Sequence, residues 1–425
     1  MDLEVVAIGT ELLLGFTVDT NARTLGQELA AIGIRVARRT TVPDDPAAIH
    51  DAVSQALDRT GIVLTTGGLG PTRDDITKQV IADLYGWPLE WRPAIWESLV
   101  ARFAAAGRVP VAANRCQAEV PAGAMILPNP RGTAPGLWLE GAPGLVIMLP
   151  GVPREMAGLL REEVMPRLAD RIRARTPEQD PPVIRSLVVR TTGLPESSLA
   201  EQVTGVEERI APLTLAYLPG IDGVDLRLTA WNLPPSEAAR RLDAAARDLE
   251  RTLAPYAWGR DDDDVAARVL ATARTAGHTL ALAESCTGGG IAERLTAVPG
   301  SSDVMRGGIV AYHNEVKEGS LGVPAAVIEA HGAVSAEVAS AMATGALERL
   351  GATVALSVTG IAGPGGGTPE RPVGLVWFGL AGPWGLTTVR HRFGGNREEI
   401  RARTGQYGLC LLLRKLEGGS WKFEV

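Results

Sequence analysis

The octapeptide A-E-S-C-T-G-G-G, from Ala283 to Gly290, follows a short apolar run (Thr279 to Ala283) and precedes an amphipathic run (Ile291 to Leu295). This order predicts a strand, a tight glycine-rich turn and a helix. Backbone N–H groups in such a turn converge on one point, which suits an anion or a developing oxyanion. Ser285 and Thr287 lie in the turn, and a hydroxyl there is a candidate nucleophile for acyl chemistry if another residue takes its proton. The alternative is that one of these hydroxyls only caps the helix.

Five further motifs follow the octapeptide in order. They are G-S-S (Gly300 to Ser302), G-G-I-V-A-Y-H-N-E-V-K (Gly307 to Lys317), L-G-V (Leu321 to Val323), G-A-V-S (Gly332 to Ser335) and T-G-I-A-G-P-G-G-G-T (Thr359 to Thr368). Together with the octapeptide they closely resemble the C-terminal domain of the competence/damage-inducible protein A (CinA) family, over Val265 to about Leu413. Members of that family are nicotinamide mononucleotide deamidases, so the resemblance implies an amidohydrolase.

A deamidase of this kind needs a nucleophile, a proton acceptor, an oxyanion site and a phosphate clamp. Ser285 is the predicted nucleophile; Cys286 is disfavoured because neighbouring side chains in a turn point differently and the resemblance places the reaction on the serine. The resemblance also implies Lys317 as the proton acceptor and Tyr312 as a proton relay or orienting group. Lys317 can act as a base only if burial or a nearby positive charge lowers its pKa. Without the resemblance, Lys317 would be an ordinary surface lysine and Tyr312 a half-buried strand aromatic.

A second glycine-rich loop, Thr359 to Thr368, follows a strand predicted over 353–358 and contains five glycines. Its N–H groups form a second concavity for an anion, and the sequence leaves open which loop holds the phosphate and which the oxyanion. Arg397 is a candidate for a phosphate or ribose contact, because a guanidinium binds phosphate bidentately; helix capping or a surface role is the alternative. The predicted substrate-binding residues of this domain are Thr287, Gly288, Gly289, Thr359, Gly360, Gly363 and Arg397. The amide step needs no metal, and His313 and His331 lack the clustered partners of a zinc site.

The first 170 residues alternate short β-branched runs with helical patterns. Strands are predicted over 4–8, 35–41 and 62–66, and helices over 22–32, 46–57 and 76–85. Asp19 or Thr20 is expected to cap the first helix. The alternation predicts a doubly wound parallel α/β domain, in which ligands bind beyond the carboxyl ends of the strands.

The loop T-T-G-G-L-G-P-T-R-D-D, Thr65 to Asp75, lies at the carboxyl end of the third predicted strand. It lacks the G-K-[ST] ending of a Walker loop and the spacing of a dinucleotide fingerprint. It can still hold a phosphate, since its glycines permit close backbone approach; the predicted contacts are Gly67, Gly68, Gly70 and Thr72. Asp74 and Asp75 offer oxygen ligands for a divalent ion that would bridge protein and phosphates. Alternatively, Asp74 caps the next helix and Asp75 favours its positive end.

Three more motifs follow this loop: N-R-C-Q-A (Asn114 to Ala118), N-P-R-G-T-A-P-G (Asn129 to Gly136) and L-P-G-V-P-R-E-M (Leu149 to Met156). With the loop they resemble the molybdopterin-binding-like domain that forms the N-terminal half of CinA proteins. That resemblance implies an ADP-ribose pyrophosphatase with a divalent metal such as Mg or Co, although distant relatives act on molybdopterin. The metal would bind Asp74 or Asp75, with Glu11 as a further candidate. Asn114 and Asn129 are candidates for ligand contact, and either could instead brace a loop.

The middle of the chain predicts a separate small unit. A polar, proline-containing stretch at 171–182 indicates a linker, and beyond it come strands at 183–190, 213–217 and 224–230 and helices at 196–209 and 235–253. The resemblance identifies this α+β unit as the KH-like middle domain of the family. Gly220 to Gly223 matches the KH G-x-x-G by letters but would join two strands and carries an acid, so we predict a spacer or dimer element and not an RNA-binding site. The acidic run Asp261 to Asp264 predicts a helix start.

Composition limits the classes of function. The chain has 425 residues, a net charge of −7 and a pI of about 5.5, which argues against a general nucleic-acid binder. Cys116, Cys286 and Cys410 form neither a disulfide framework nor a metal motif. The first residues do not resemble a secretory signal, and no apolar run is long enough to span a membrane. We therefore expect a cytoplasmic protein without nucleic-acid or membrane partners.

These observations predict an α/β protein of three domains, 1–170, 171–258 and 259–425, with two activities of pyridine-nucleotide salvage. The C-terminal domain would convert nicotinamide mononucleotide to nicotinic acid mononucleotide and ammonia through an acyl-enzyme on Ser285. The N-terminal domain would hydrolyse ADP-ribose to AMP and ribose 5-phosphate. Alternatives are an N-terminal domain that handles molybdopterin, and a partner in DNA recombination or competence. The family resemblance favours a homodimer.

Overall fold

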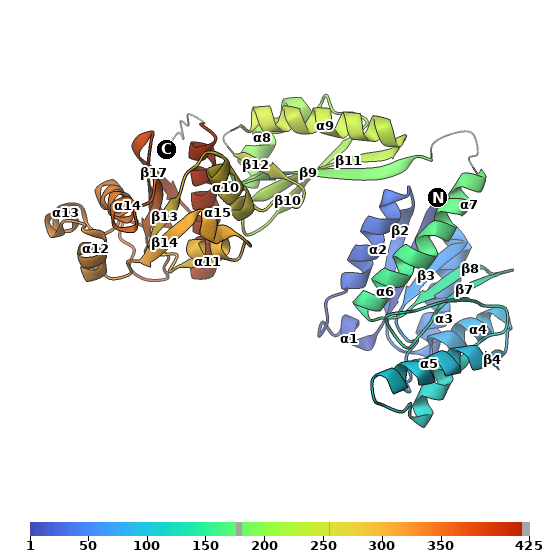
Figure 1. The fold of residues 1–425 in the computed structure, drawn as a ribbon. Helices are drawn as coiled ribbons and strands as arrows, with labels where there is room; N and C mark the ends of the chain where they lie inside the picture. The colour runs from blue at the N-terminus through green and yellow to red at the C-terminus, as the bar shows by residue number, and fades with distance from the viewer. Residues whose placement is uncertain (176–180, 255, 419–425) are drawn as a thin grey trace. The chain divides into compact units, whose positions relative to one another are not determined.

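The structure is a computed structural model that describes residues 1–175, 181–254 and 256–418. Contacts between residues divide the chain into two compact units. One unit consists of Met1–Arg185 and Ala230–Arg240, and the other of Ser186–Thr229 and Arg241–Val425. Figure 1 shows the helices and strands of each unit.

The N-terminal domain is built on a six-stranded sheet of order β2-β1-β3-β8-β7-β6. Its strands are β1 (Asp2–Ile8), β2 (Arg35–Val42), β3 (Ile62–Thr66), β6 (Met125–Leu127), β7 (Gly136–Gly141) and β8 (Gly144–Leu149). The strands β2, β1, β3 and β8 are parallel, and β7 pairs antiparallel with both β8 and β6. The predicted doubly wound α/β domain is therefore confirmed.

Helices cover both faces of this sheet, because alternate side chains of its strands are buried on opposite sides. In β1, Leu3 and Val5 pack in one apolar cluster with α2 and α6, and Val6 and Ile8 pack in another with α3 and α4. The helices are α1 (Thr10–Leu13), α2 (Thr20–Ala31), α3 (Pro46–Thr60), α4 (Thr77–Tyr85), α5 (Pro93–Ala105), η1 (Ala112–Ala118), α6 (Pro153–Leu159), η2 (Leu160–Val164) and α7 (Met165–Arg175). A separate two-stranded antiparallel sheet pairs β4 (Leu89–Trp91) with β5 (Glu119–Pro121).

The start of α2 and the end of α7 bear on two sequence-based predictions, the cap at Asp19 or Thr20 and the linker at 171–182. Asp19 caps α2 as expected: its Oδ1 accepts a hydrogen bond of 2.9 Å from the N–H of Ala22. The linker predicted at 171–182 is wrong in its first part, because α7 continues to Arg175. The helix continues because Ile172 extends its apolar face and packs against the cluster that contains Leu3 and Val5. Residues 176–180 of the predicted linker lie outside the described residues.

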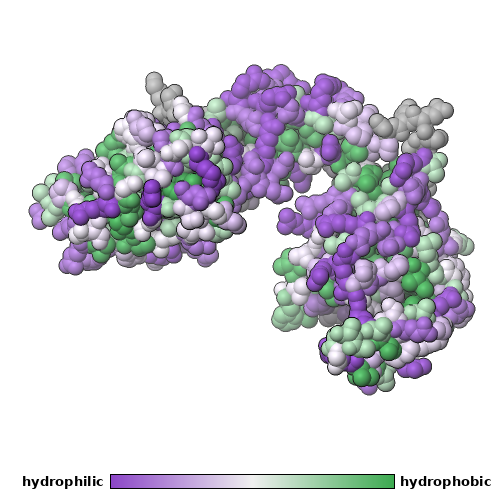
Figure 2. All heavy atoms as spheres, viewed as in Figure 1, coloured by the Kyte–Doolittle hydropathy of each residue, from purple (hydrophilic) through white to green (hydrophobic). Residues whose placement is uncertain are grey.

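The middle domain is a small α+β unit, as predicted. Its elements are β9 (Val183–Thr191), α8 (Glu196–Glu207), β10 (Thr214–Pro219), β11 (Val224–Leu233), α9 (Pro235–Thr252) and β12 (Ala257–Arg260), with sheet order β10-β11-β9-β12. Gly220 to Gly223 joins the antiparallel strands β10 and β11. On α9, Ala238, Leu242, Ala246 and Leu249 are buried at helical spacing, and hydrophilic residues cover its outward side in Figure 2.

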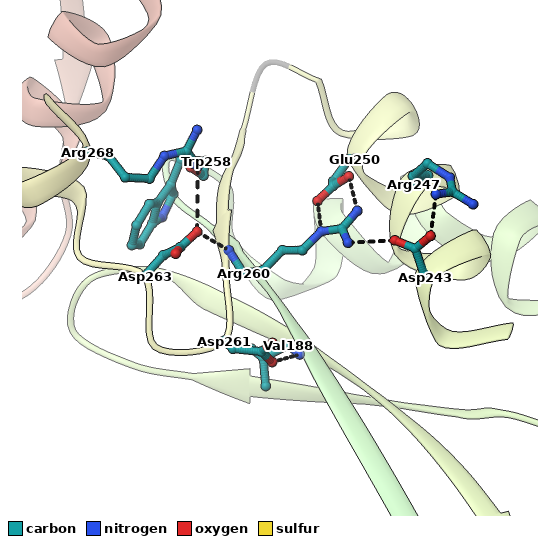
Figure 3. Close-up of polar contacts among 9 residues, drawn as sticks. All are labelled: Val188, Asp243, Arg247, Glu250, Trp258, Arg260, Asp261, Asp263 and Arg268. Carbon is teal, nitrogen blue, oxygen red and sulfur yellow. Dashed lines mark hydrogen bonds and ion pairs between the residues drawn. The ribbon is translucent and has the colours of Figure 1, made fainter. Parts of the chain in front are cut away.

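Ion pairs and a hydrogen bond connect β12 of the middle sheet to the helices on either side of it in the chain, within the same unit (Figure 3). The guanidinium of Arg260, the last residue of β12, donates to both oxygens of Glu250 at 2.5 and 2.7 Å and to Asp243 at 2.9 Å, both on α9. From the next helix of the chain, Arg268 donates to the main-chain oxygen of Trp258 in β12. The middle sheet is thereby bonded to the C-terminal domain.

The C-terminal domain has a five-stranded sheet of order β14-β13-β15-β16-β17. The strands are β13 (Leu280–Glu284), β14 (Met305–Val310), β15 (Val354–Gly360), β16 (Leu375–Gly382) and β17 (Gly385–Arg392); the first three are parallel and the last two antiparallel. The helices are α10 (Val265–Thr275), α11 (Gly290–Thr296), η3 (Ser301–Asp303), α12 (Asn314–Leu321), α13 (Ala325–His331), α14 (Ala336–Leu350) and α15 (Arg397–Leu416).

This sheet is also covered on both faces. In β13, Leu280 and Leu282 pack in a cluster with α10, α11 and α15, whereas Ala281 and Ala283 pack with α12, α13 and α14. Asp264 caps α10 by accepting from two backbone N–H groups, which confirms the predicted helix start. None of the helices in the described residues is long and apolar enough to cross a membrane.

Candidate functional site

The residues predicted for the C-terminal site meet at the carboxyl ends of three neighbouring parallel strands. Ser285 follows β13, Tyr312 lies two residues beyond β14, and Thr359 lies near the end of β15. The strand register aligns Glu284 with both Val310 and Val358, so the three strands end at the same level. Ligands of open α/β sheets bind at this edge.

Ser285 and Lys317 are in contact although 32 residues separate them. Lys317 lies on α12 and is 1% exposed, and Ser285 is 7% exposed. The Lys317 Nζ lies 3.3 Å from the Ser285 Oγ, 2.9 Å from the Ala311 carbonyl oxygen and 3.5 Å from that of Tyr312. Burial of the amine lowers the pKa of Lys317 below its usual value.

This geometry suits a neutral amine. A neutral amine can donate its two protons to the carbonyl oxygens of Ala311 and Tyr312, and its lone pair then accepts the hydroxyl proton of Ser285. In the described part of the chain, no carboxylate makes an ion pair with Lys317 that would hold it protonated. The arrangement can therefore activate Ser285 as a nucleophile.

Tyr312 is placed differently from the predicted relay. Its side chain is 60% exposed, and its hydroxyl accepts a hydrogen bond of 2.7 Å from the Arg397 Nη2. The other guanidinium nitrogen of Arg397 donates to the carbonyl oxygen of Gly363 at 2.6 Å. Arg397 and Tyr312 thus form an exposed pair at the rim of the site, and only the main chain of Tyr312 approaches Lys317.

Sequence reasoning missed Glu284, whose carboxylate caps the turn after β13. Glu284 is 1% exposed. Its Oε2 accepts from the N–H groups of Gly289 at 3.0 Å and Ile291 at 3.1 Å, and its Oε1 accepts from Ala292 at 2.8 Å. The alternative that Ser285 caps α11 is wrong, since the capping residue Gly289 has no side chain and no other hydroxyl takes its place.

Thr287 does not cap the helix either. It is 2% exposed, and its Oγ1 is buried without a hydrogen-bond partner in the described part of the chain. Its main-chain oxygen accepts from Arg401 at 2.9 Å. A buried, unpaired hydroxyl costs free energy unless a ligand completes its bonding. The predicted substrate-binding role of Thr287 is consistent with this position.

Cys286, between these hydroxyl residues, is an inert thiol. It is 6% exposed, and burial raises the pKa of its thiol to about 12. A thiol of that pKa supplies almost no thiolate near neutral pH, and the thiolate is the reactive form. Ser285 remains the candidate nucleophile.

The second glycine-rich loop lies against the first. Thr359 donates from its Oγ1 to the carbonyl oxygen of Ala333 at 2.7 Å. A Cβ at Gly360 would lie 3.1 Å from the Cys286 sulfur and 2.7 Å from Val376, so glycine permits the close approach of the two loops. Beyond it, the N–H groups of residues 365–367 donate to no protein acceptor in the described part of the chain.

In the N-terminal domain, a pocket of about 360 Å³ lies beyond the carboxyl ends of the parallel strands. Among its lining residues are the predicted Gly67, Gly68, Gly70, Glu11, Asp74 and Asp75. Asp44, Gln117 and Glu155 also line it and were missed. Asp44 could have been found from its place just beyond β2, and Glu155 from its place in the first turn of α6.

Asp75 braces the loop in which it lies. One of its oxygens accepts from the N–H of Gly70 at 2.7 Å, and the other accepts from the N–H of Thr72 at 2.8 Å and from the Thr72 hydroxyl. The residue that precedes α4 is Ile76, so neither aspartate caps the helix by its side chain. In the described residues, the N–H groups of Gly68 and Leu69 donate to no protein acceptor.

Asn114 and Asn129 also brace loops, which was the alternative to ligand contact. Asn114 accepts from the N–H of Val111 and donates to Gln117. Asn129 donates to the carbonyl oxygen of Ala134 at 2.8 Å and to Glu155 at 2.7 Å, and its oxygen accepts from two backbone N–H groups. The side-chain bonding capacity of Asn129 is thereby used within the protein.

The pocket suits a metal that is shared with a ligand. Within the described ranges, no three His, Cys, Asp or Glu side chains are grouped so that they could hold an ion by themselves. Glu11 and Asp74 nevertheless line the pocket beside the glycine loop, and both are exposed. Mg²⁺ is typically held by one or two carboxylates together with substrate phosphates and water, and these donors fit that pattern.

Three family models match the chain. The CinA C-terminal domain matches residues 262–416, a probable molybdopterin binding domain matches residues 4–170, and the damage-inducible protein CinA KH domain matches residues 186–259. The matches are in the order of the three structural parts described above.

Similar proteins extend over nearly the whole chain. A CinA-like protein of Gemmatimonas aurantiaca is 50% identical over 416 residues, 97% of this chain and 96% of that protein. A CinA-like protein of Parasynechococcus marenigrum is 44% identical over 396 residues, 93% of each. The solved competence/damage-inducible protein CihA from Agrobacterium tumefaciens is 42% identical and covers 36% of this chain and 93% of its own, with a TM-score of 0.35.

Proposed function

Because this chain belongs to the CinA family, we propose that its C-terminal domain is an amidohydrolase that converts nicotinamide mononucleotide to nicotinic acid mononucleotide and ammonia. The observation that carries the proposal is the contact of 3.3 Å between the buried Nζ of Lys317 and the Oγ of Ser285. A serine paired with a lysine of lowered pKa is a known solution to acyl transfer.

In the first step, the Ser285 Oγ attacks the carboxamide carbon while the Lys317 Nζ takes its proton. The negative charge that develops on the amide oxygen needs N–H donors in place. Lys317 then returns the proton to the amide nitrogen, the C–N bond breaks, ammonia leaves, and a nicotinoyl ester remains on Ser285.

In the second step, a water molecule attacks the ester carbon and Lys317 accepts its proton. The C–O bond to Ser285 breaks, the proton passes to the Ser285 Oγ, and nicotinic acid mononucleotide is released. The exposed guanidinium of Arg397 and the solvated N–H groups at 365–367 are the proposed contacts for the phosphate and ribose. Thr287 and Thr359 would lie against the pyridine carboxamide at the buried end.

The test is ammonia release from nicotinamide mononucleotide without added metal. Wild type is expected to release ammonia, and Ser285→Ala to lose at least about 10³-fold in kcat because no other nucleophile replaces it. Cys286→Ala is the matched control, since it alters the next side chain and should retain activity. Undiminished release by a folded Ser285→Ala variant would contradict the proposed nucleophile.

We also propose that the N-terminal domain hydrolyses ADP-ribose to AMP and ribose 5-phosphate. The support is the pocket of about 360 Å³, which has carboxylates and, at its glycine loop, the N–H groups of Gly68 and Leu69, for which the described residues offer no acceptor. Glu11 and Asp74 would hold a divalent ion, which when bound offsets phosphate charge and makes water more acidic. These two N–H groups would bind oxygens of the diphosphate and orient its bridging P–O bond for cleavage.

This second activity is tested by AMP release from ADP-ribose in the presence of Mg²⁺ or Co²⁺. Asp74→Asn should lower the rate at least about 10²-fold through weaker metal binding. Glu97→Gln, which removes an exposed carboxylate of α5 that does not line the pocket, should leave the rate unchanged. Equal rates for all three proteins would contradict the proposed ligand.

The match to a probable molybdopterin binding domain favours one other candidate for this pocket, a pterin. Saturable quenching of pterin fluorescence by wild type, lost in Asp74→Asn but with no AMP release from ADP-ribose, would favour that candidate. A homodimer and a cytoplasmic location are also part of the proposal. The support for the homodimer is the family to which the chain belongs, and the support for the location is that Cys116, Cys286 and Cys410 are free thiols, as is usual in a reducing compartment.

A further inference from the structure

Glu284 is a buried carboxylate that directly precedes the proposed nucleophile in the chain. A buried carboxylate is costly unless hydrogen bonds compensate for its lost hydration. Three N–H groups, from Gly289, Ile291 and Ala292, do so at 2.8 to 3.1 Å. Glu284 is the last residue of β13, and the N–H groups that it binds lie at the start of α11. Its side chain therefore connects the two ends of the turn that contains Ser285.

The same bonds leave few donors in the turn for a ligand. The N–H of Gly288 bonds the carbonyl oxygen of Ser285 at 3.1 Å, and that of Gly290 bonds the carbonyl oxygen of Thr287 at 3.3 Å. The N–H of Ser285 itself bonds Val358 at 3.0 Å. Across residues 285–292 of the described chain, only the N–H groups of Cys286 and Thr287 have no protein acceptor.

We propose that Glu284 is a positioning residue: by holding the N–H groups of residues 289–292, it fixes the turn so that the N–H groups of Cys286 and Thr287 form the oxyanion site of Ser285. This inference deepens the proposed deamidase and rests on it. The N–H of the residue that follows the nucleophile forms part of the oxyanion site in serine enzymes of the α/β-hydrolase fold, so the N–H of Cys286 has a precedent for this role.

The bonds of Glu284 also bear on which glycine-rich loop takes the phosphate. A phosphate at the start of α11 would meet the negative charge of Glu284 and would find the N–H groups of Gly289, Ile291 and Ala292 already engaged. The loop at 359–368 has unengaged N–H groups and the Arg397 guanidinium beside Gly363. The phosphate therefore belongs to that second loop.

Glu284 does not act through the general base. Among the described residues, the oxygens of Glu284 bond only backbone N–H groups, and the Lys317 Nζ bonds Ser285 and two main-chain oxygens. A change at Glu284 should therefore lower kcat without moving the pH at which Lys317 becomes active. A residue that merely stabilised the fold would not produce this combination of effects.

The experiment compares Glu284→Gln with Glu293→Gln, each measured for ammonia release from nicotinamide mononucleotide. Glutamine keeps the size of Glu284 but replaces one acceptor oxygen by a donor NH₂ that faces backbone N–H groups. We expect kcat to fall about 10²-fold with KM within threefold, because oxyanion donors act in the transition state. Glu293→Gln removes an equal charge from the exposed side of the same helix and should retain wild-type kcat.

A second readout does not depend on the substrate. A fluorophosphonate reacts with an activated serine through a charged pentacoordinate state, so its rate on Ser285 should fall in Glu284→Gln and not in Glu293→Gln. If wild type reacts with this probe but releases no ammonia, the deamidase proposal fails while the role of Glu284 is still tested. Equal probe rates and equal kcat in folded Glu284→Gln and wild type would overturn the inference.

Glu284→Asp covers the case in which the glutamine variant does not fold. Aspartate keeps the charge but is shorter by one methylene, so it cannot reach all three N–H groups. We expect the kcat of Glu284→Asp to be lower than that of wild type but not abolished, with an unchanged pH profile. Wild-type kcat in Glu284→Asp would overturn the inference, because anchoring of the turn would then be unnecessary.

Discussion

The Nζ of Lys317 has one hydroxyl and two carbonyl oxygens as its neighbours. A protonated amine in this buried position would lack the carboxylate that normally compensates a buried charge. The same site offers a neutral amine a complete set of partners. The proposed role of Ser285 as nucleophile therefore rests on the burial of Lys317, which favours the neutral amine.

The pH dependence of the deamidase tests this environment. Because the base must be unprotonated, kcat/KM should rise with pH through an ionisation below the usual lysine pKa, since burial lowers the pKa of Lys317. Lys317→Arg should lose about 10²- to 10⁴-fold, because a guanidinium remains protonated and cannot accept the Ser285 proton. Rates at several pH values are the measurement. A Lys317→Arg variant with the wild-type profile would exclude Lys317 as the base.

At the scale of elements, β17 and α15 meet in an aromatic cluster. The His391 ring lies 4.6 Å from that of Tyr407, in a stacked arrangement, and 4.4 Å from that of Phe393. Burial lowers the pKa of His391 to about 4. The cluster therefore holds a neutral imidazole and excludes the protonated form.

This cluster predicts a loss of stability in mild acid. The folded-state pKa of His391 is below the unfolded value of about 6.5, so the unfolded chain binds the proton first as pH falls. The stabilisation that the neutral His391 gives to the folded state is therefore fully present above about pH 6.5, and it is lost as the pH falls toward 4. Between pH 7 and 5, wild type should lose about 1–2 kcal/mol relative to His391→Phe, which does not titrate.

Thermal unfolding at the two pH values measures this difference, as a larger fall of the melting temperature in wild type than in His391→Phe. His313→Gln is the control, because the exposed His313 ring lies in no such cluster. An identical pH dependence in wild type and His391→Phe would contradict the assignment to His391.

The elements were predictable from the sequence because hydrophobic periodicity follows local geometry. The predicted strand at 62–66 and the helix expected to start at Pro46 agree with β3 and α3. The uses of particular side chains were less predictable, since they depend on contacts made after folding. Asp75 and Glu284 are both acids beside glycine loops, and only the structure shows that each holds backbone N–H groups. The pairing of Lys317 with Ser285 rested on family resemblance.

On the scale of the whole molecule, the chain carries two candidate sites built in the same way. Each lies at the carboxyl edge of a parallel sheet, and in each a carboxylate engages some N–H groups of a glycine loop. Within the described residues, other N–H groups of each loop have no protein acceptor, among them those of Gly68 and Leu69 in one site and of Cys286 and Thr287 in the other. The sites lie in different compact units of the chain. Each unit supplies the proposed catalytic residues of its own site, so the two reactions should be separable.

Metal removal should separate them. Treatment with EDTA is expected to lower AMP release from ADP-ribose at least about 10²-fold, because diphosphate hydrolysis then lacks an ion to offset phosphate charge. Ammonia release from nicotinamide mononucleotide should stay within about twofold, since Ser285 and Lys317 supply nucleophile and base themselves. Added Mg²⁺ or Co²⁺ should restore AMP release. Ser285→Ala should give the reverse pattern, with AMP release intact.

One further control, a variant of the N-terminal pocket, makes the comparison decisive. Asp74→Asn should reproduce the effect of EDTA on AMP release without any chelator, and it should leave ammonia release unchanged, because Asp74 lies in the N-terminal pocket. Loss of both activities on chelation, with both restored by the metal, would mean that the ion serves the deamidase or the folding of the chain. AMP release that survives in metal-free protein would instead remove the reason to place an ion at Glu11 and Asp74.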